Sequence, residues 1–254
     1  MTVAESGRRP KYWLIAMALR TAIDSGQYPP GARLPGENDV MRDHGVARAT
    51  ARQALAQLVN WGLAEARKGS GIYVREFRPI VRDGIGRLGQ STWQSGTSVW
   101  DAETEGRDLA VDQVEVSQAD APDRICRLLG LSDGAATVLR SRRYVLDGKP
   151  VLLSRSWLPA RIASGTPIAL PDPGPGGIYA RLAEAGHAPV RFREDLRSRM
   201  PRAEESERLA IAPGTPVVDI CRIALDADGT PVEVNEMTAD SSAYIFRYEF
   251  DRHR

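Results

Sequence analysis

The first 75 residues alternate between stretches with helical periodicity and short breaks. Apolar side chains that recur at three or four positions predict helices at about 12–25, 36–44 and 48–61. Pro29-Pro30-Gly31 separates the first two helices, and Gly45 ends the second. The third helix buries one stripe, made of Ala51, Leu55, Leu58 and Val59.

A hairpin follows the third helix. Residues 63–66 and 72–74 have the composition of short strands, and Lys68-Gly69-Ser70-Gly71 lies between them. Glycine reaches the positive φ angles that tight hairpin turns need. Three helices and a hairpin in about 65 residues are the element order of a winged helix-turn-helix.

The rest of the chain is dominated by strand signals. Alternating or β-branched stretches predict strands at 111–116, 138–145, 151–157, 217–225, 232–237 and 244–250. Helical periodicity returns at 178–185 and 202–209. Asp147-Gly148 and 226–229 are turns that join neighbouring strands into hairpins. Repeated hairpins with few helices predict an antiparallel α+β domain. We expect a winged helix-turn-helix DNA-binding domain at 1–76, a linker at 77–98, and the α+β domain at 99–254.

The charge is distributed unevenly. The whole chain carries +1, but residues 1–78 hold 12 Lys and Arg against 7 Asp and Glu, or +5. The remainder is therefore at −4. A basic N-terminal third on an acidic remainder indicates a polyanionic partner for one domain only.

Several classes of protein are not expected. The chain has no run of 18 apolar residues and no secretory signal, so we expect no membrane partner. Cys126 and Cys221 are far apart and lack metal-ligand spacing, as in buried thiols of a reducing cytoplasm. The three His are scattered, and no nucleophile elbow, zinc-protease motif or phosphate loop occurs. We expect no cofactor, no metal, no catalytic residues and no enzyme activity.

Three segments resemble the GntR family of bacterial regulators. They are YPPGARLPGENDV, HGVARATARQALAQL and GLAEARKGSGIYV, and the match spans residues 11–75. Residues 140–159 and 224–234 resemble the UTRA ligand-sensing domain of the HutC branch. The resemblance implies a homodimer, a two-fold operator in double-stranded DNA, and a small-molecule effector that changes DNA affinity. It also implies a chorismate-lyase-like second domain that as a rule has no catalysis.

The predicted third helix carries the main candidates for reading DNA. Arg48 matches the leading Arg of the family and can form two hydrogen bonds to guanine O6 and N7. Thr50 and Gln53 lie opposite Leu55, and Arg52 lies at the flank, where it suits a phosphate or a neighbouring base. Alternatively, these side chains are simply solvated. Ala47 replaces the family's Ser, so a helix cap worth about 1 kcal/mol is missing.

Four further candidates for contacting DNA lie in the wing or beside the second helix. Gly69 lets the backbone of the wing approach a groove, and Lys68 can reach a phosphate or the minor groove. Arg33 and Asn38 flank the second helix and can contact phosphate. The alternative for Lys68 and Gly69 is an ordinary hairpin turn.

The resemblance implies an effector pocket lined from two hairpins of the second domain, and Arg142 matches the first of two family Arg. Period-two alternation places Arg142 with Tyr144 on one strand face, and Ser154 with Ser156 on one face of the partner strand. The resemblance adds Glu233 and Tyr244. Tyr144 replaces a second family Arg, which predicts a less anionic effector. Alternatively, Arg142 and Glu233 pair with each other across strands and bind nothing.

Three functions remain open at this point. The first is a sequence-specific transcriptional regulator, most often a repressor, whose operator affinity an effector changes. The second is an effector-free dimeric DNA-binding protein whose second domain only dimerises. The third is a lyase-like enzyme with a DNA-binding appendage, which lacks any acid–base group beyond Arg142 and Glu233.

Overall fold

A computed structural model describes residues 9–67, 69–76, 79–84, 88, 100, 104, 106–211 and 214–249. The chain divides into two compact units. The first is Met1–Arg78 with Ile211–Thr215, and the second is Pro79–Ala210 with Pro216–Arg254.

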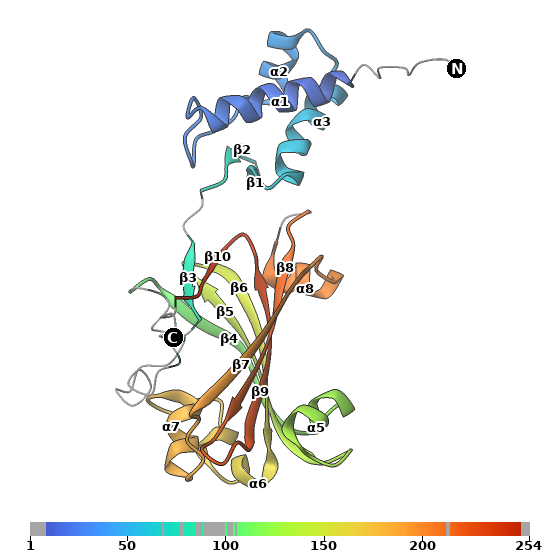
Figure 1. The fold of residues 1–254 in the computed structure, drawn as a ribbon. Coiled ribbons are helices and arrows are strands. Elements are labelled where there is room, and N and C mark those ends of the chain that lie inside the picture. Colours follow the sequence, from blue (N-terminus) through green and yellow to red (C-terminus); the bar gives the residue numbers. More distant parts are fainter. Residues whose placement is uncertain are drawn as a thin grey trace, which may run out of the picture. The chain divides into compact units, whose positions relative to one another are not determined.

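The N-terminal unit has the expected order of three helices and a hairpin (Figure 1). Its elements are α1 (Lys11–Asp24), α2 (Glu37–His44), α3 (Arg48–Asn60), β1 (Ala64–Arg67) and β2 (Gly71–Val74). Gly45 ends α2 in the left-handed conformation, at φ 60°. No side chain caps the start of α3, as expected from Ala47. The winged helix-turn-helix prediction is therefore confirmed.

One apolar core holds the three helices and the hairpin together. It joins residues of α1, α2 and α3 with Leu34, Ala64 and Val74. Trp13 and Trp61 pack edge to face at its margin, with ring centroids 5.1 Å apart. Burial of one stripe of α3 leaves its opposite side to solvent.

The C-terminal unit is built on a six-stranded antiparallel sheet with the order β4-β5-β6-β9-β8-β7 (Figure 1). The strands are β4 (Leu109–Asp120), β5 (Ala136–Leu146), β6 (Lys149–Pro159), β7 (Arg191–Arg199), β8 (Val217–Leu225) and β9 (Pro231–Asp240). Asp147 and Gly148 form the tight turn between β5 and β6, both with positive φ. The antiparallel α+β prediction is confirmed.

Helices cover parts of both faces of this sheet. The helices are α5 (Asp123–Leu129), α6 (Ala160–Ala163), α7 (Gly177–Glu184) and α8 (Ala203–Leu209), with a 3-10 turn, η3, at Pro167–Ala169. On one face, α6, η3 and α7 pack against Leu158 and Val232. On the other face, α5 packs against Trp157 and Val234. Trp157 and Leu158, which are neighbours along β6, thus point into different cores, as the pleat requires.

Part of the predicted linker is a strand. Ile80–Asp83 forms β3, which pairs in parallel with β10 (Tyr244–Arg247). The expected final strand at 244–250 therefore ends at Arg247, and it lies outside the six-stranded sheet. Periodicity did not indicate β3 because the strand has only four residues and one of its two buried side chains is Arg82.

Among the described residues, no helix has the length and apolar character needed to cross a membrane.

Candidate nucleic-acid interface and ligand cavity

The solvent side of α3 carries a cationic front. Arg48, Arg52 and Gln53 are exposed, whereas Thr50 is half-buried. This corrects the expected arrangement, in which Thr50 shared the open face and Arg52 lay at its flank. The reason is that Ala51, Ala54 and Leu58 define the buried side more than Leu55 alone does. Arg52 consequently lies well within the open face, and Thr50 lies at its edge.

Arg48 and Arg52 meet at the carboxylate of Glu37, the first residue of α2. Arg48 Nε donates to Glu37 Oε2 at 2.9 Å, and Arg52 Nε donates to Oε1 at 2.8 Å. These hydrogen bonds, chiefly the one from Arg52, hold the pKa of Glu37 below its usual value. Glu37 is a residue that the sequence reasoning missed. The turn between α2 and α3 brings it to the recognition face, and this contact is not visible in helical periodicity.

The other DNA candidates fall into two places. Asn38 follows Glu37 and is exposed on the same end of α2. Arg33 pairs with Tyr73 of β2 as an isolated bridge, and its guanidinium lies beside Gly71. Gly69 is at the exposed turn of the hairpin, at φ 73°. Lys68 lies outside the described residues. Arg33 thus belongs with the wing, and Asn38 with the α2–α3 front.

A small cavity of about 50 Å³ opens between the sheet and α7 in the C-terminal unit. Its lining includes Arg142 of β5, Arg222 of β8, and Glu233 and Asn235 of β9. Trp100, Gly176, Gly177, Ile178 and Tyr179 complete it. Two predicted effector residues, Arg142 and Glu233, are therefore brought together.

Hydrogen bonds tie most of the polar groups of the cavity to the sheet. Tyr179 Oη donates to Glu233 Oε2 at 2.7 Å, and Arg222 lies 4.0 Å from the same oxygen. The two serines that were expected to bind the effector do not line the cavity, but they bond to residues that do. Ser156 accepts from Arg142 at 3.3 Å, and Ser154 donates to Asn235 at 2.9 Å.

The buried polar atoms of this lining that have no hydrogen-bond partner among the described residues include Arg142 Nε, Glu233 Oε1 and Asn235 Nδ2. Buried polar atoms usually have partners, because leaving one unpaired costs about 1–3 kcal/mol. Unpaired donors and an unpaired acceptor around one cavity are the chemistry of a site that receives a polar ligand.

The two predicted tyrosines lie behind or away from the cavity. Tyr144 is buried, and its ring packs on Trp100 with centroids 4.4 Å apart. Burial raises the pKa of Tyr144 to about 12. Tyr244 belongs to an apolar cluster with Ile80 and Met237, and stacks on Phe246. Neither tyrosine lines the cavity.

The alternative pairing of Arg142 with Glu233 is not what the sheet produces. β5 and β9 are separated by β6 in the strand order. Glu233 instead faces Arg222 and Tyr179, both of which sequence reasoning missed. The sequences of β8 and β9 do contain a sign of these buried polar residues. Arg222 lies two residues from Ile220 and Ala224 on an apolar face, and Asn235 lies two residues after Glu233.

A chain of buried charges leads from the cavity to β3. Arg82 donates through Nη1 and Nη2 to the two carboxylate oxygens of Glu194, at 2.8 and 2.7 Å. Glu194 in turn lies 4.0 Å from Arg222, which faces Glu233. The side chains of Arg82 and Glu194 are 1% and 7% exposed. These contacts join the first strand after the N-terminal unit to the ligand cavity.

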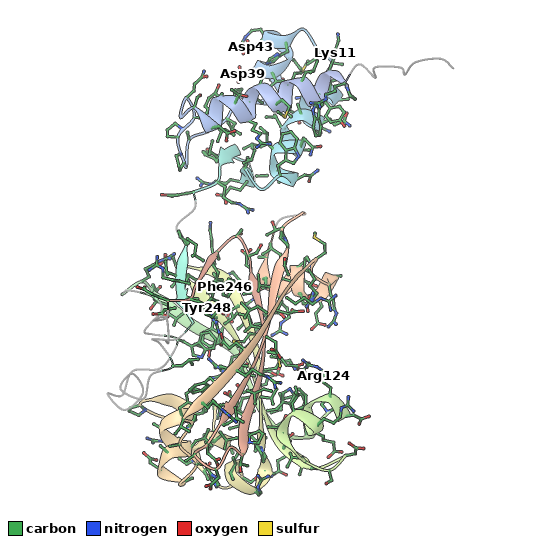
Figure 2. All side chains as sticks on the ribbon, viewed as in Figure 1. Lys11, Asp39, Asp43, Arg124, Phe246 and Tyr248 are labelled. Atoms are coloured by element: carbon green, nitrogen blue, oxygen red, sulfur yellow. The ribbon has the colours of Figure 1, made fainter. Side chains whose placement is uncertain are left out.

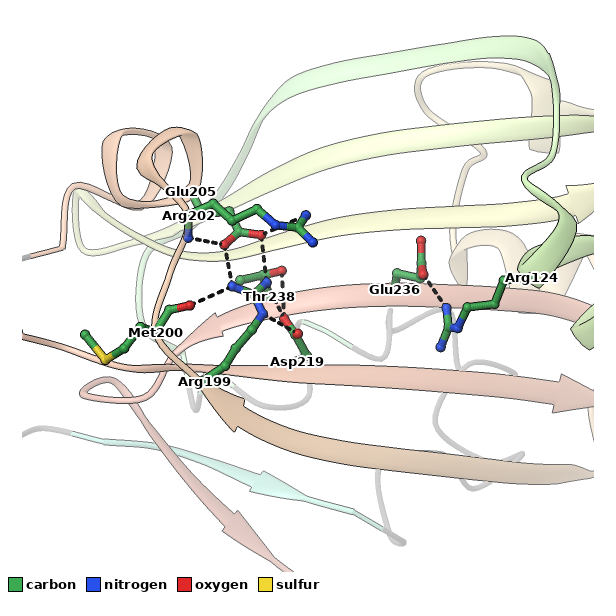
Figure 3. Close-up of polar contacts among 8 residues, drawn as sticks. All are labelled: Arg124, Arg199, Met200, Arg202, Glu205, Asp219, Glu236 and Thr238. Carbon is green, nitrogen blue, oxygen red and sulfur yellow. Dashed lines mark hydrogen bonds and ion pairs between the residues drawn. The ribbon is translucent and has the colours of Figure 1, made fainter.

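The opposite face of the sheet has a larger cleft of about 590 Å³ between α5 and α8. Figure 3 shows its main polar contacts. Arg199 binds both Glu205 and Asp219, and Arg124 binds Glu236 at 2.6 Å. The hydrogen bonds that Arg199 donates to the carboxylates of Glu205 and Asp219 raise the pKa of Arg199. Arg199 and Arg124 are neutralised by carboxylates within the protein. We take the smaller cavity as the better candidate ligand site because its lining holds buried polar atoms without hydrogen-bond partners.

No group of three or more His, Cys, Asp or Glu in the described part of the chain is arranged to hold a metal ion. Cys126 and Cys221 are free thiols, the first buried and the second half-buried.

Comparisons with known proteins agree with both halves of this arrangement. The family model described as "Bacterial regulatory proteins, gntR family" matches residues 11–74, and that of the UTRA domain matches residues 104–245. An uncharacterized HTH-type transcriptional regulator of Streptomyces coelicolor is 30% identical, over 96% of this chain and 93% of the relative. The HTH-type transcriptional repressor NagR of Bacillus subtilis is 24% identical, over 99% of each chain.

Solved structures show the same fold. A crystal structure of a GntR-family transcriptional regulator is 28% identical, with a TM-score of 0.63 over 96% of this chain and 99% of that one. PhnF from Mycobacterium smegmatis has a TM-score of 0.59 at 24% identity, over 94% of this chain and all of that one. With a winged helix, a UTRA domain and these relatives, the chain belongs to the gntR family of bacterial regulatory proteins and is a DNA-binding transcriptional regulator.

Proposed function

We propose that this regulator is a homodimeric repressor that reads an operator with the front of α3 and releases it when a small polar molecule enters the UTRA cavity. Two features of the chain support this best. One unit has an exposed cationic helix front, and the other has a cavity with buried polar atoms that lack hydrogen-bond partners. NagR, a relative over the full length, is named a repressor. Operators are reached in the cytoplasm, where we place the protein.

In the DNA-reading role, Arg48 contacts a guanine in the major groove. The two Nη groups of Arg48 are not engaged by Glu37, so they can form a fork on O6 and N7. Arg52 and Asn38 contact the adjacent backbone, and Gln53 reaches a neighbouring base. Thr50 lies at the edge of the helix face, where it suits a phosphate.

The wing supplies a second set of contacts. Gly69 allows a close backbone approach, and Arg33 lies beside the same hairpin. Lys68 stays a predicted phosphate or minor-groove contact. A two-fold dimer would present two such surfaces to a palindromic operator, with half-sites spaced by the helical repeat.

In the effector role, the cavity selects a small molecule with one anionic group and at least one hydroxyl or amine. Arg142 supplies a cation, and Glu233 Oε1 accepts a hydrogen bond from the ligand. Asn235 Nδ2 donates to a ligand oxygen, and Trp100 and Tyr179 pack against its apolar part. A cavity of about 50 Å³ is smaller than a metabolite, so binding requires movement of the lining.

The DNA-binding proposal is tested by recovering genomic fragments that the purified protein binds and measuring their affinity in a salt series. We expect tight binding that weakens steeply as salt rises, because phosphate contacts release counterions. Absence of salt-sensitive affinity for any duplex, selected or random, would refute the proposal.

The effector proposal is tested by a thermal-shift screen of metabolites against the parent protein and Arg142→Ala. We expect a compound that raises the parent's melting temperature, does not raise that of the variant, and lowers operator affinity. A blank across a broad library favours the effector-free dimer. Turnover of aromatic acids by the purified protein would instead favour a lyase-like enzyme.

A further inference from the structure

The carboxylate of Glu37 occupies an unusual position on the DNA-reading face. It comes from the first turn of α2, yet it binds two arginines of α3 that are 11 and 15 residues further along the chain. The Glu37 side chain is 27% exposed, whereas those of Arg48 and Arg52 are 62% and 67% exposed. A half-buried carboxylate therefore lies between two exposed arginines on the DNA-reading face.

The contacts divide the donors of the two arginines unequally. Glu37 takes only Nε of Arg48, so Nη1 and Nη2 of that guanidinium form no hydrogen bond to the carboxylate. Arg52 gives Glu37 both Nε, at 2.8 Å, and Nη2, at 3.3 Å. Each Nη carries two N–H groups, so the Nη1–Nη2 edge of each guanidinium can still form a fork on guanine. The carboxylate thus restrains Arg52 more than Arg48 and leaves each arginine an edge for DNA.

Holding both arginines has a thermodynamic consequence for recognition. Long exposed side chains lose rotamer freedom when they bind, and prior ordering reduces that loss. A carboxylate that already fixes one arginine restrains the second at a smaller entropic cost. Both side chains therefore lose less rotamer freedom when they bind DNA.

The negative charge also acts on duplexes that lack the correct bases. Non-specific affinity comes almost entirely from attraction between cations and phosphates. An anion at the centre of the reading face weakens that attraction, and specificity is the difference between the two affinities. Hydrogen bonds from Arg52 and Arg48 lower the pKa of Glu37, so the carboxylate is ionised at neutral pH.

We propose that Glu37 is a specificity-determining positioning residue, which orients Arg48 and Arg52 for the operator and penalises non-cognate DNA. This inference rests on the proposed base-reading role of Arg48. It assigns no direct base contact to Glu37.

The test measures affinities of the full-length protein for two duplexes by fluorescence anisotropy. One duplex is the sequence that the parent protein recovers from a random library, and the other is its scrambled counterpart. The variants are Glu37→Gln, which removes the charge, and Glu37→Asp, which keeps the charge but shortens its reach. Asp43→Asn is the matched control, because Asp43 is an exposed acid of the same helix (Figure 2) that pairs with Arg42 in the described part of the chain.

For Glu37→Gln we expect weaker binding to the selected duplex and stronger binding to the scrambled one, so that their affinity ratio falls by about ten-fold. For Glu37→Asp we expect the scrambled duplex to bind as weakly as with the parent, while binding to the selected duplex stays reduced. Asp43→Asn should strengthen both affinities slightly and leave the ratio within about two-fold.

Two results would overturn the inference. The first is an unchanged affinity ratio in Glu37→Gln, including an equal rise in both affinities, which would make Glu37 a simple mask over the arginines. The second is a change in the ratio no larger than that of Asp43→Asn. Arg48→Ala in the same assay distinguishes failure of the inference about Glu37 from failure of the proposed base-reading role of Arg48. If it lowers the ratio and Glu37→Gln does not, only the role of Glu37 fails, whereas an unchanged ratio in Arg48→Ala refutes the base-reading role itself.

Discussion

The two units use the same pair of side chains, arginine and glutamate, in opposite environments. In the N-terminal unit, Arg48 and Arg52 meet Glu37 at the surface, where the arginines are more than half exposed. In the C-terminal unit, Arg82 meets Glu194 in the interior, where neither side chain is more than 7% exposed. The contacts have similar lengths, so distance does not distinguish them.

Solvent decides what each pair can do. An exposed pair contributes little to stability, and its side chains stay accessible to DNA. A buried pair is costly to break, because removal of one partner strands the other charge away from water. The surface pairs are therefore available for recognition. The interior pairs fix the geometry around the ligand cavity.

The largest effect that distinguishes the two environments is expected from Arg82→Met. This change leaves Glu194 with a weakened set of cationic partners in the interior, and we expect a loss of about 3–5 kcal/mol in unfolding free energy. Calorimetry of the full-length protein, resolved into the transitions of its units, measures it. Arg67→Met is the control, because Arg67 pairs with Glu65 at the surface, and its loss should stay below about 1 kcal/mol.

A double replacement sharpens this result. Arg82→Met with Glu194→Met removes both charges, and it should recover most of the stability lost in the single variant. Equal losses for Arg82→Met and Arg67→Met would show that burial does not separate the two pairs.

A smaller effect is expected from Tyr179→Phe. The change removes the hydroxyl that donates to the buried Glu233 carboxylate at 2.7 Å, and we expect a loss of about 1–3 kcal/mol. Tyr73→Phe removes a hydroxyl that bonds Ser70 on the exposed wing, and its unfolding free energy should barely change. Urea unfolding of the two variants provides the measurement. A larger loss at Tyr73 would reverse the comparison.

The smallest effect is expected from pH. The hydrogen bond from Arg199 holds the pKa of Glu205 below its usual value of 4.5. A lowered pKa in the folded state means that the pair stabilises the protein above pH 4.5, and that this contribution is lost as pH falls through the folded value. Unfolding free energies of the parent and Glu205→Gln should therefore differ at about pH 6, and the difference should shrink as the pH falls below 4.5. A difference that grows as the pH falls would contradict this assignment.

Helical periodicity predicted the N-terminal unit well, because its core is made of apolar stripes such as that of Ala51, Leu55 and Leu58. The DNA candidates on α3 followed from that stripe. The position of Glu37 did not follow, since it depends on how α2 packs against α3. Periodicity carries information about faces of one element and none about contacts between two.

The C-terminal unit was harder to predict from the sequence, because its sheet buries charged side chains. Strand β7 escaped the sequence reasoning, since its inward residues include Glu194 and its outward residues are charged as well. Arg82 was assigned to a linker for the same reason. Helix α5 has seven residues, too few for a clear period. Arg142 and Glu233 were found through the family resemblance, whereas Arg222 and Tyr179 required the three-dimensional sheet.

The most direct test of the account is the affinity of Arg48→Ala for the selected duplex and its scrambled counterpart, with Arg20→Ala as control. Arg20 is an arginine of α1 that pairs with Asp24 at the surface. We predict that Arg48→Ala lowers the ratio of the two affinities by at least about five-fold, while Arg20→Ala leaves it unchanged. Equal losses on both duplexes for Arg48→Ala would contradict the claim that the front of α3 reads the operator.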